Sequence, residues 1–236
     1  MTSAQHEPTP SAASWLVGTA VLGVAAGVLA RVVRYLDSRP LWSDEATVAG
    51  MLLERNLASL WSPDPADPVT PVGFALAVEA AVWLFGEGER ALRAVSFVAG
   101  ILALPLFWQL ATRCLGRRDA WLALGIFAVL EPLVFYSSEL KQYATDVLIA
   151  LSIAVPGAAL IRERAAPGRI LVFAIAAGAV GVWISLPAAF VAGGLVSALV
   201  LRGLGGDRPS LRRAPRSTPL EHIESERCNA DLFRCR

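Results

Sequence analysis

Two adjacent carboxylates, Asp44 and Glu45, follow the first long apolar run of the chain and are the residues best suited to chemistry. Charged groups beside a bilayer are costly and are usually retained for a function. Ser43 is typical of a helix N-cap, and acids in a first helical turn complement the helix dipole without any chemistry. The same dipole favours the negative charge that a general base needs, so the structural and catalytic interpretations are compatible.

A second polar cluster fills the short segment 136–143, whose sequence is YSSELKQY. A solvated turn is its simplest interpretation, with Glu139 and Lys141 neutralising each other. A turn does not require two tyrosines and a couple able to form an ion pair. Tyr136, Glu139, Lys141 and Tyr143 are therefore candidate substrate-binding residues.

Two arginines, Arg90 and Arg93, precede the second apolar run and share a helix face because they are three residues apart. The planar fork of donors on arginine suits phosphate, although snorkelling interfacial anchors explain the pair equally well. Asp146 lies one turn beyond the 136–143 segment, inside an apolar run, where a carboxylate is by default a site candidate. Together these groups suit acid–base chemistry on a substrate that carries a phosphate.

Composition places these residues in a membrane protein. Of 236 residues, 55% are hydrophobic and only 17% are charged, against about a quarter charged in soluble domains. The net charge of +1 says nothing about nucleic acid, but the sequence has no long basic run with interleaved aromatics, so no nucleic-acid partner is expected. The cysteines, Cys114, Cys228 and Cys235, lack metal-ligand spacing and favour neither zinc nor disulfides.

The apolar runs predict an all-α polytopic transmembrane bundle of about six spans. They cover residues 14–33, 94–112, 119–137, 143–161, 170–185 and 187–203. No Lys or Arg precedes the first run, which favours a retained helix over a cleaved signal peptide. The last two runs are separated by three residues and predict a tight helical hairpin.

Arginine-rich loops orient this bundle. Residues 113–118, 162–169 and the tail from Arg202 lie on one side of a six-span chain, which the positive-inside rule makes cytoplasmic. The segments 34–93 and 138–142 then face outwards. Arg31 and Arg34, at the outer end of the first run, disagree with this assignment.

The first outer loop, 34–93, predicts interfacial helices. After Ser43, one helical face carries apolar residues at Ala49, Leu53, Leu57 and Leu60. An apolar helix from about Val72 to Phe85 is too short to cross a bilayer comfortably and is expected to be interfacial or re-entrant.

The predicted domain organisation is a membrane domain over 14–203 with short ends on the cytoplasmic side. Residues 1–13 form the N-terminus. Residues 204–236 carry no periodic apolar face and predict a disordered tail. A truncated or frame-shifted gene end is the alternative explanation of that tail.

Five motifs occur in an order that resembles a known family. They are LWSDE at 41–45, TPVGF at 70–74, LFGEGERALR at 84–93, LGRR at 115–118 and YSSELKQY at 136–143. The series resembles the N-terminal half of bacterial GT-C glycosyltransferases of the family 39 type. These are relatives of protein O-mannosyltransferases and of the aminoarabinose transferase that modifies lipid A. The resemblance covers about residues 14–203.

The resemblance implies a multi-pass enzyme of the inner (plasma) membrane that takes a sugar from a polyprenyl-phosphate donor. The sugar passes, with inversion, to an extracytoplasmic acceptor that is a glycan, a lipid or a protein. Asp44 matches the family's essential acid and would bind and deprotonate the acceptor hydroxyl, with Glu45 as its neighbour. Glu139 would hold acceptor or metal, and Lys141 the donor phosphate. A divalent metal cation is left open as a cofactor.

The chain departs from the family pattern in two places. Val69 and Thr70 precede Pro71, where many relatives have a second proline or a histidine, so the acceptor contacts are expected to differ. Relatives also continue beyond the sixth span, so an incomplete fragment is one expectation. The competing interpretation is a non-catalytic membrane protein that binds or moves a polyprenyl lipid.

Overall fold

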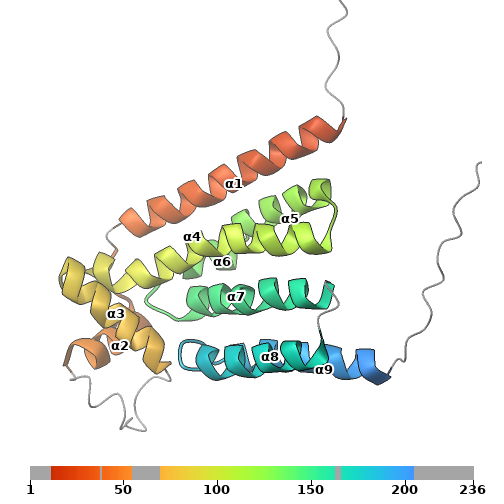
Figure 1. The fold of residues 1–236 in the computed structure, drawn as a ribbon. Coiled ribbons are helices and arrows are strands. Elements are labelled where there is room, and N and C mark those ends of the chain that lie inside the picture. The colour runs from red at the N-terminus through yellow and green to blue at the C-terminus, as the bar shows by residue number, and fades with distance from the viewer. Residues whose placement is uncertain (1–11, 38, 55–69, 163–165, 205–236) are drawn as a thin grey trace, which may run out of the picture. The chain divides into compact units, whose positions relative to one another are not determined.

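The computed structural model describes residues 12–37, 39–54, 70–162 and 166–204, and every regular element in these ranges is an α-helix (Figure 1). The helices are α1 (Ala12–Leu36), α2 (Ser43–Glu54), α3 (Val72–Phe85), α4 (Glu89–Cys114), α5 (Arg117–Val129), α6 (Glu131–Tyr136), α7 (Tyr143–Arg162), α8 (Pro167–Gly181) and α9 (Ala188–Leu204). Contacts group residues 1–199 into one unit and 200–236 into another, and the interactions below lie within the first. The predicted all-α membrane bundle is confirmed.

Among the described helices, three are long and apolar enough to cross a bilayer: α1 over Trp15–Leu36, α4 and α7. Each has a mean hydropathy near 2 over its apolar window (2.1, 1.9 and 2.0). The helices α8 and α9 are shorter, with 15 and 17 residues. Three of the expected spans are therefore continuous helices of full membrane length.

The expectation of one unbroken span over 119–137 is wrong. The structure divides it into α5 and α6 at Leu130, whose backbone is extended (φ −60°, ψ 117°). Pro132 explains the break, because proline has no N–H for the carbonyl four residues earlier and its ring collides with that oxygen. The carbonyl left without its helical donor belongs to Ala128.

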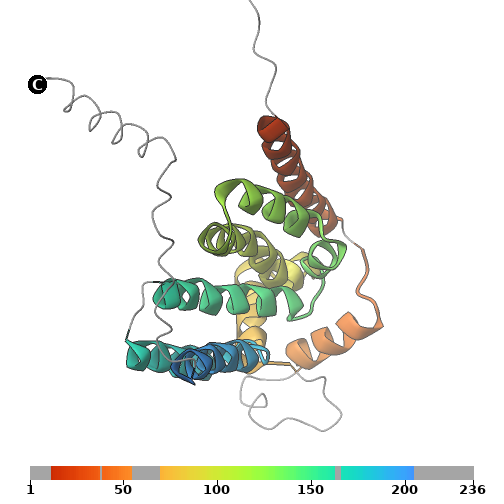
Figure 2. The same cartoon turned by 90° about the vertical axis from the view of Figure 1, so that its right-hand side faces the viewer.

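The helix α4 is the centre of the packing, since it contacts α1, α3, α5, α6 and α7. In both views α4 runs beside α7 and α1 beside α5 (Figure 1 and Figure 2). Small residues allow the close approach of α1 to α5. A Cβ on Gly23 would lie 3.4 Å from the carbonyl oxygen of Gly125, and a Cβ on Gly27 would overlap the carbonyl of Ala128. Such small-residue contacts are typical of helix pairs in membranes.

The two helices that the sequence predicts as interfacial begin where they are expected. The apolar helix α3 covers Val72–Phe85, and Gly86 follows it at φ 89° and ψ 176°, a conformation that favours glycine. The helix α2 starts at Ser43, but its predicted apolar face is wrong at Leu53, which is 45% exposed. The buried apolar residues of α2 are Val48, Ala49 and Leu52.

Several predictions concern residues that the structure does not describe. Leu57, Leu60 and Val69 are among them, and so are the tail cysteines Cys228 and Cys235. The predicted cytoplasmic ends, 1–13 and 204–236, lie almost entirely outside the described ranges. Cys114 lies within the described ranges and is an exposed free thiol.

Candidate functional site

A buried ion pair between Glu45 and Arg93 forms the base of the candidate site. Arg93 Nε donates to Glu45 Oε1 at 3.0 Å, and Arg93 Nη2 donates to Oε2 at 2.6 Å. The side chains are 1% exposed for Glu45 and 3% for Arg93. Two parallel hydrogen bonds of this kind give an arginine–carboxylate pair both strength and a fixed geometry.

The Glu45–Arg93 pair joins segments that are far apart in the sequence. The backbone amide of Leu140 donates to Glu45 Oε1 at 2.7 Å, and Arg93 Nη1 donates to the carbonyl of Arg39 at 3.0 Å. Burial by itself would raise the pKa of Glu45. The hydrogen bonds from Arg93 and Leu140, with the nearby positive charges, outweigh burial and lower that pKa below its ordinary value.

The ion pair also explains which face of α2 is buried. Glu45, Val48, Ala49 and Leu52 follow the i, i+3, i+4, i+7 spacing of one helix face. That face packs into a small core with α3, α4 and Leu140. The core consists of Val48, Ala49, Leu52, Phe74, Ala75, Val78, Leu92 and Leu140. The carboxylate therefore points inward, and Leu53 is left on the exposed side.

A second buried acid, Glu139, is paired with Arg39. The side chain of Glu139 is 2% exposed, and Arg39 Nη2 also donates to the carbonyl of Ser138 at 2.9 Å. Arg34, from α1, donates through Nε to Ser138 Oγ at 3.2 Å and lies over the Phe135 ring at 4.9 Å. Sequence reasoning missed the roles of Arg34 and Arg39. Their position directly before the LWSDE motif was the available signal.

The loop 137–142 rests on α4 through two small residues one helical turn apart. Ser96 Oγ donates to the carbonyl of Lys141 at 2.9 Å. A Cβ on Gly100 would lie 2.5 Å from the Cβ of Ser137, so only glycine allows this approach. Both contacts were missed from the sequence, where a serine and a glycine four apart in an apolar run were the only sign.

Above this buried network lies an exposed ion pair, Asp44–Lys141. Lys141 Nζ is 3.2 Å from Asp44 Oδ2, and the side chains are 18% exposed for Lys141 and 67% for Asp44. Asp44 is the chain neighbour of Glu45, and Lys141 that of Leu140. The buried Leu140–Glu45 hydrogen bond therefore sets the spacing of the exposed pair.

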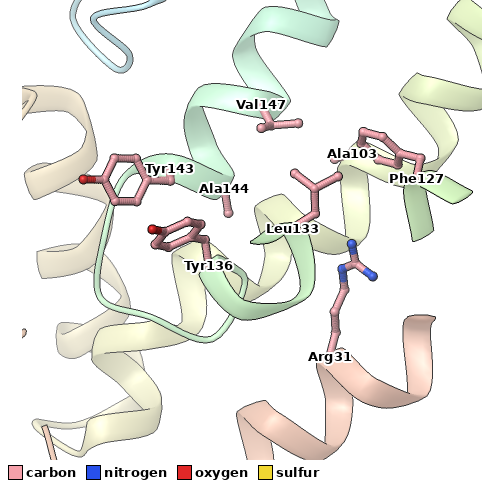
Figure 3. Close-up of a pocket in the computed structure, with 9 residues that line it drawn as sticks. Arg31, Ala103, Phe127, Leu133, Tyr136, Tyr143, Ala144 and Val147 are labelled. Atoms are coloured by element: carbon pink, nitrogen blue, oxygen red, sulfur yellow. The ribbon is translucent and has the colours of Figure 1, made fainter. Parts of the chain in front are cut away.

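The remaining candidates lie around this centre. Arg90 Nη2 donates to the carbonyl of Leu36 at 3.0 Å and thereby links α4 to the end of α1. The rings of Tyr136 and Tyr143 pack edge to face, with centroids 4.6 Å apart, beside a cavity (Figure 3). Asp146 lies in the first turn of α7, where its backbone amide donates to the carbonyl of Gln142 at 2.8 Å and its Oδ1 is buried without a hydrogen-bond partner.

No group of three or more His, Cys, Asp or Glu side chains within the described ranges is arranged to hold a metal ion. The two buried acids, Glu45 and Glu139, are each committed to an arginine. Asp44, in contrast, is exposed and has the ammonium of Lys141 beside it. A base next to a cation suits removal of a proton from one group while negative charge grows on another.

Comparison with known proteins gives one match. Residues 69–212 match the family model described as dolichyl-phosphate-mannose-protein mannosyltransferase. The matched range includes Arg90, Arg93 and the loop 137–142, whereas Asp44 and Glu45 precede it. No curated protein and no solved structure matches the chain.

Proposed function

Because the chain belongs to the dolichyl-phosphate-mannose-protein mannosyltransferase family, a family of GT-C membrane glycosyltransferases, we propose that it transfers a sugar from a polyprenyl-phosphate donor. The acceptor is a hydroxyl of a glycan, lipid or protein on the extracytoplasmic side of the inner (plasma) membrane. Transfer inverts the anomeric carbon, since a single displacement by the acceptor oxygen needs only one base and one leaving group.

The pairing of exposed Asp44 with Lys141 is the observation that carries this proposal. Lys141 is the only lysine in a chain with 21 basic residues. The arginines described above tie helices and loops together through rigid forks of donors. An ammonium on a flexible stem can instead exchange partners without breaking a fixed geometry.

In the proposed reaction, Lys141 leaves Asp44 for the phosphate of the donor, and Asp44 then accepts the hydrogen bond of the acceptor hydroxyl. The hydroxyl proton passes to the Asp44 carboxylate as the acceptor oxygen bonds to the anomeric carbon. The bond from that carbon to the phosphate oxygen breaks, and its electron pair leaves with the lipid phosphate. Lys141 stabilises the charge that develops there.

Glu45 is assigned a positioning role in this scheme. Its two oxygens accept hydrogen bonds from Arg93 and from the Leu140 amide, so it is not available to a substrate. Its function is to hold the start of α2 against the loop 137–142, which keeps Asp44 and Lys141 together. Positioning of this precision is worth a large part of a barrier when the leaving group is already good.

The experiment is an assay of the purified chain with a radiolabelled polyprenyl-phosphate sugar and a panel of hydroxyl acceptors. The proposal predicts a labelled product whose anomeric configuration is opposite to that of the donor. A non-catalytic lipid-binding protein would bind the donor and give no product. A product with retained configuration would contradict the single-displacement scheme.

A further inference from the structure

Near the C-terminal end of α1 lies a buried cation that has no acidic partner among the described residues. The residue Arg31 is 1% exposed. Its Nη1 donates to the carbonyls of Gly27 at 3.0 Å and Ala128 at 2.6 Å, while its Nε has no hydrogen-bond partner. No salt bridge to Arg31 is found in the described part of the chain.

One of these bonds has a structural purpose, but that purpose does not require a charge. The carbonyl of Ala128 has no helical donor because Pro132 lacks an N–H, and Arg31 donates a hydrogen bond to that carbonyl instead. An amide side chain could donate the same bond. Arginine costs about 2.5–3.5 kcal/mol at the centre of a membrane helix on insertion scales, and Arg31, five residues before the end of α1, bears part of that cost. The charge of Arg31 is therefore unexplained by the fold.

Arg31 lines a cavity of about 60 Å³ whose walls are mainly apolar (Figure 3). The other lining residues come from α4, α5, α6 and α7: Gly100, Ala103, Phe127, Leu133, Tyr136, Tyr143, Ala144 and Val147. The Arg31 side chain extends from α1 toward this space, whereas the hydroxyl groups of Tyr136 and Tyr143 point away from it (Figure 3). A cation in an apolar cavity is suited to an anion that carries an apolar chain.

We infer that Arg31 and this cavity form a second phosphate site, in which the phosphate of a lipid phosphate monoester pairs with the guanidinium and the first carbons of the adjoining hydrocarbon occupy the cavity. The inference rests on the proposed function, because a lipid phosphate monoester is the leaving group of that reaction. Arg34 lies one helical turn nearer the loop 137–142, on the same face of α1. The cations of α1 thus lead from that loop toward the cavity.

The test measures thermal stabilisation of the full chain in detergent by farnesyl phosphate, inorganic phosphate and farnesol, without turnover. Farnesyl phosphate is expected to stabilise the protein, and R31Q is expected to weaken its apparent Kd about 10- to 100-fold, as loss of a charge-assisted contact does. R31K, which keeps the charge without the fork, should give an intermediate Kd. R113Q removes a cation from the last turn of α4, outside the cavity. It is the matched control and should bind farnesyl phosphate as the wild type does.

Two arms separate the sources of phosphate. A103L places a larger side chain in the cavity and leaves Arg31 intact. It should therefore weaken the binding of farnesyl phosphate but not the binding of inorganic phosphate. Inorganic phosphate that binds as tightly as farnesyl phosphate, with the same dependence on Arg31, would overturn the lipid assignment. Equal affinity of farnesyl phosphate for wild type, R31Q and R31K would overturn the site itself.

The readout also separates this inference from the proposed function. E87Q, at an exposed acid outside both the cavity and the Asp44–Lys141 pair, should bind farnesyl phosphate as the wild type does. If sugar transfer depends on Asp44 while farnesyl phosphate binding ignores Arg31, the inference fails and the function stands. If Arg31-dependent binding is found in a chain that transfers no sugar, the proposed function fails and the anion site stands.

Discussion

The backbone amide of Leu140 donates a 2.7 Å hydrogen bond to Oε1 of Glu45, across 95 positions of the chain. Each residue is followed or preceded by one member of the exposed Asp44–Lys141 pair. The buried hydrogen bond and the exposed ion pair thus join the same two segments, side by side. The chemistry proposed for the Asp44–Lys141 pair therefore depends on the geometry of the Glu45–Leu140 hydrogen bond.

E45Q should strongly destabilise the protein. Glutamine keeps the shape but leaves the Arg93 guanidinium buried without its counter-charge, and removing one partner of a buried pair costs about 3–5 kcal/mol. The measurement is the unfolding temperature in detergent. E87Q, at an exposed acid, should change it little. An unfolding temperature for E45Q equal to that of the wild type would show that the ion pair does not hold the site.

The stability contribution of Glu45 should depend on pH in a defined direction. Its pKa in the folded protein lies below the ordinary value of 4.5, so folding favours the ionised form. The contribution is complete above the ordinary pKa and is lost as the pH falls through the lower folded value. The difference in unfolding temperature between wild type and E45Q should therefore be constant near neutral pH and shrink below about pH 4.5. A difference that grows on acidification would contradict this account.

Lys141 can be followed by chemical labelling, because it is the only lysine of the chain. A polyprenyl-phosphate sugar should protect its ammonium from an amine-reactive reagent, and the same lipid without phosphate should not. Mass spectrometry of the modified peptide gives the labelled fraction, with the N-terminal amine as internal control. Labelling at an unchanged rate in the presence of saturating donor would exclude Lys141 as its phosphate ligand.

Two glycine substitutions should have opposite effects. G100A places a Cβ 2.5 Å from the Cβ of Ser137 and should cost about 1–3 kcal/mol through displacement of the loop 137–142. G50A, in α2, meets nothing within 4 Å and should stabilise the helix by about 0.5–1 kcal/mol. Unfolding temperatures of the two variants check the signs, and equal values would rule out close packing of the loop on α4.

The sequence was sufficient for the bounds of α3, the start of α2 and the all-α membrane class, because apolar runs and turn residues determine these locally. It did not predict the face of α2. The apolar residues alone left Leu53 on the buried side, whereas the structure places Glu45 inside because Arg93 and Leu140 satisfy it. A buried acid is recognised only when its partner is known, and that partner is 48 positions away.

The helix break at Leu130 is a second feature that depends on a residue far away in the sequence. An apolar run that contains a proline is compatible with a kinked span or with two helices. The outcome depends on which neighbour satisfies the freed carbonyl, and here Arg31 does so. Arg31 and Arg34 were noted in the sequence only as residues that contradict the charge rule for topology. Their contacts with Ala128 and Ser138 give them a role inside the protein instead.

The most direct test is the single-turnover rate of sugar transfer by D44N at saturating donor. The account predicts a fall of about 100-fold or more, which is the usual contribution of a general base, with donor affinity little changed. D37N, at another exposed acid of the segment 34–93, should retain the wild-type rate. Transfer by D44N at the wild-type rate would contradict the assignment of Asp44 as the base, and with it the central claim.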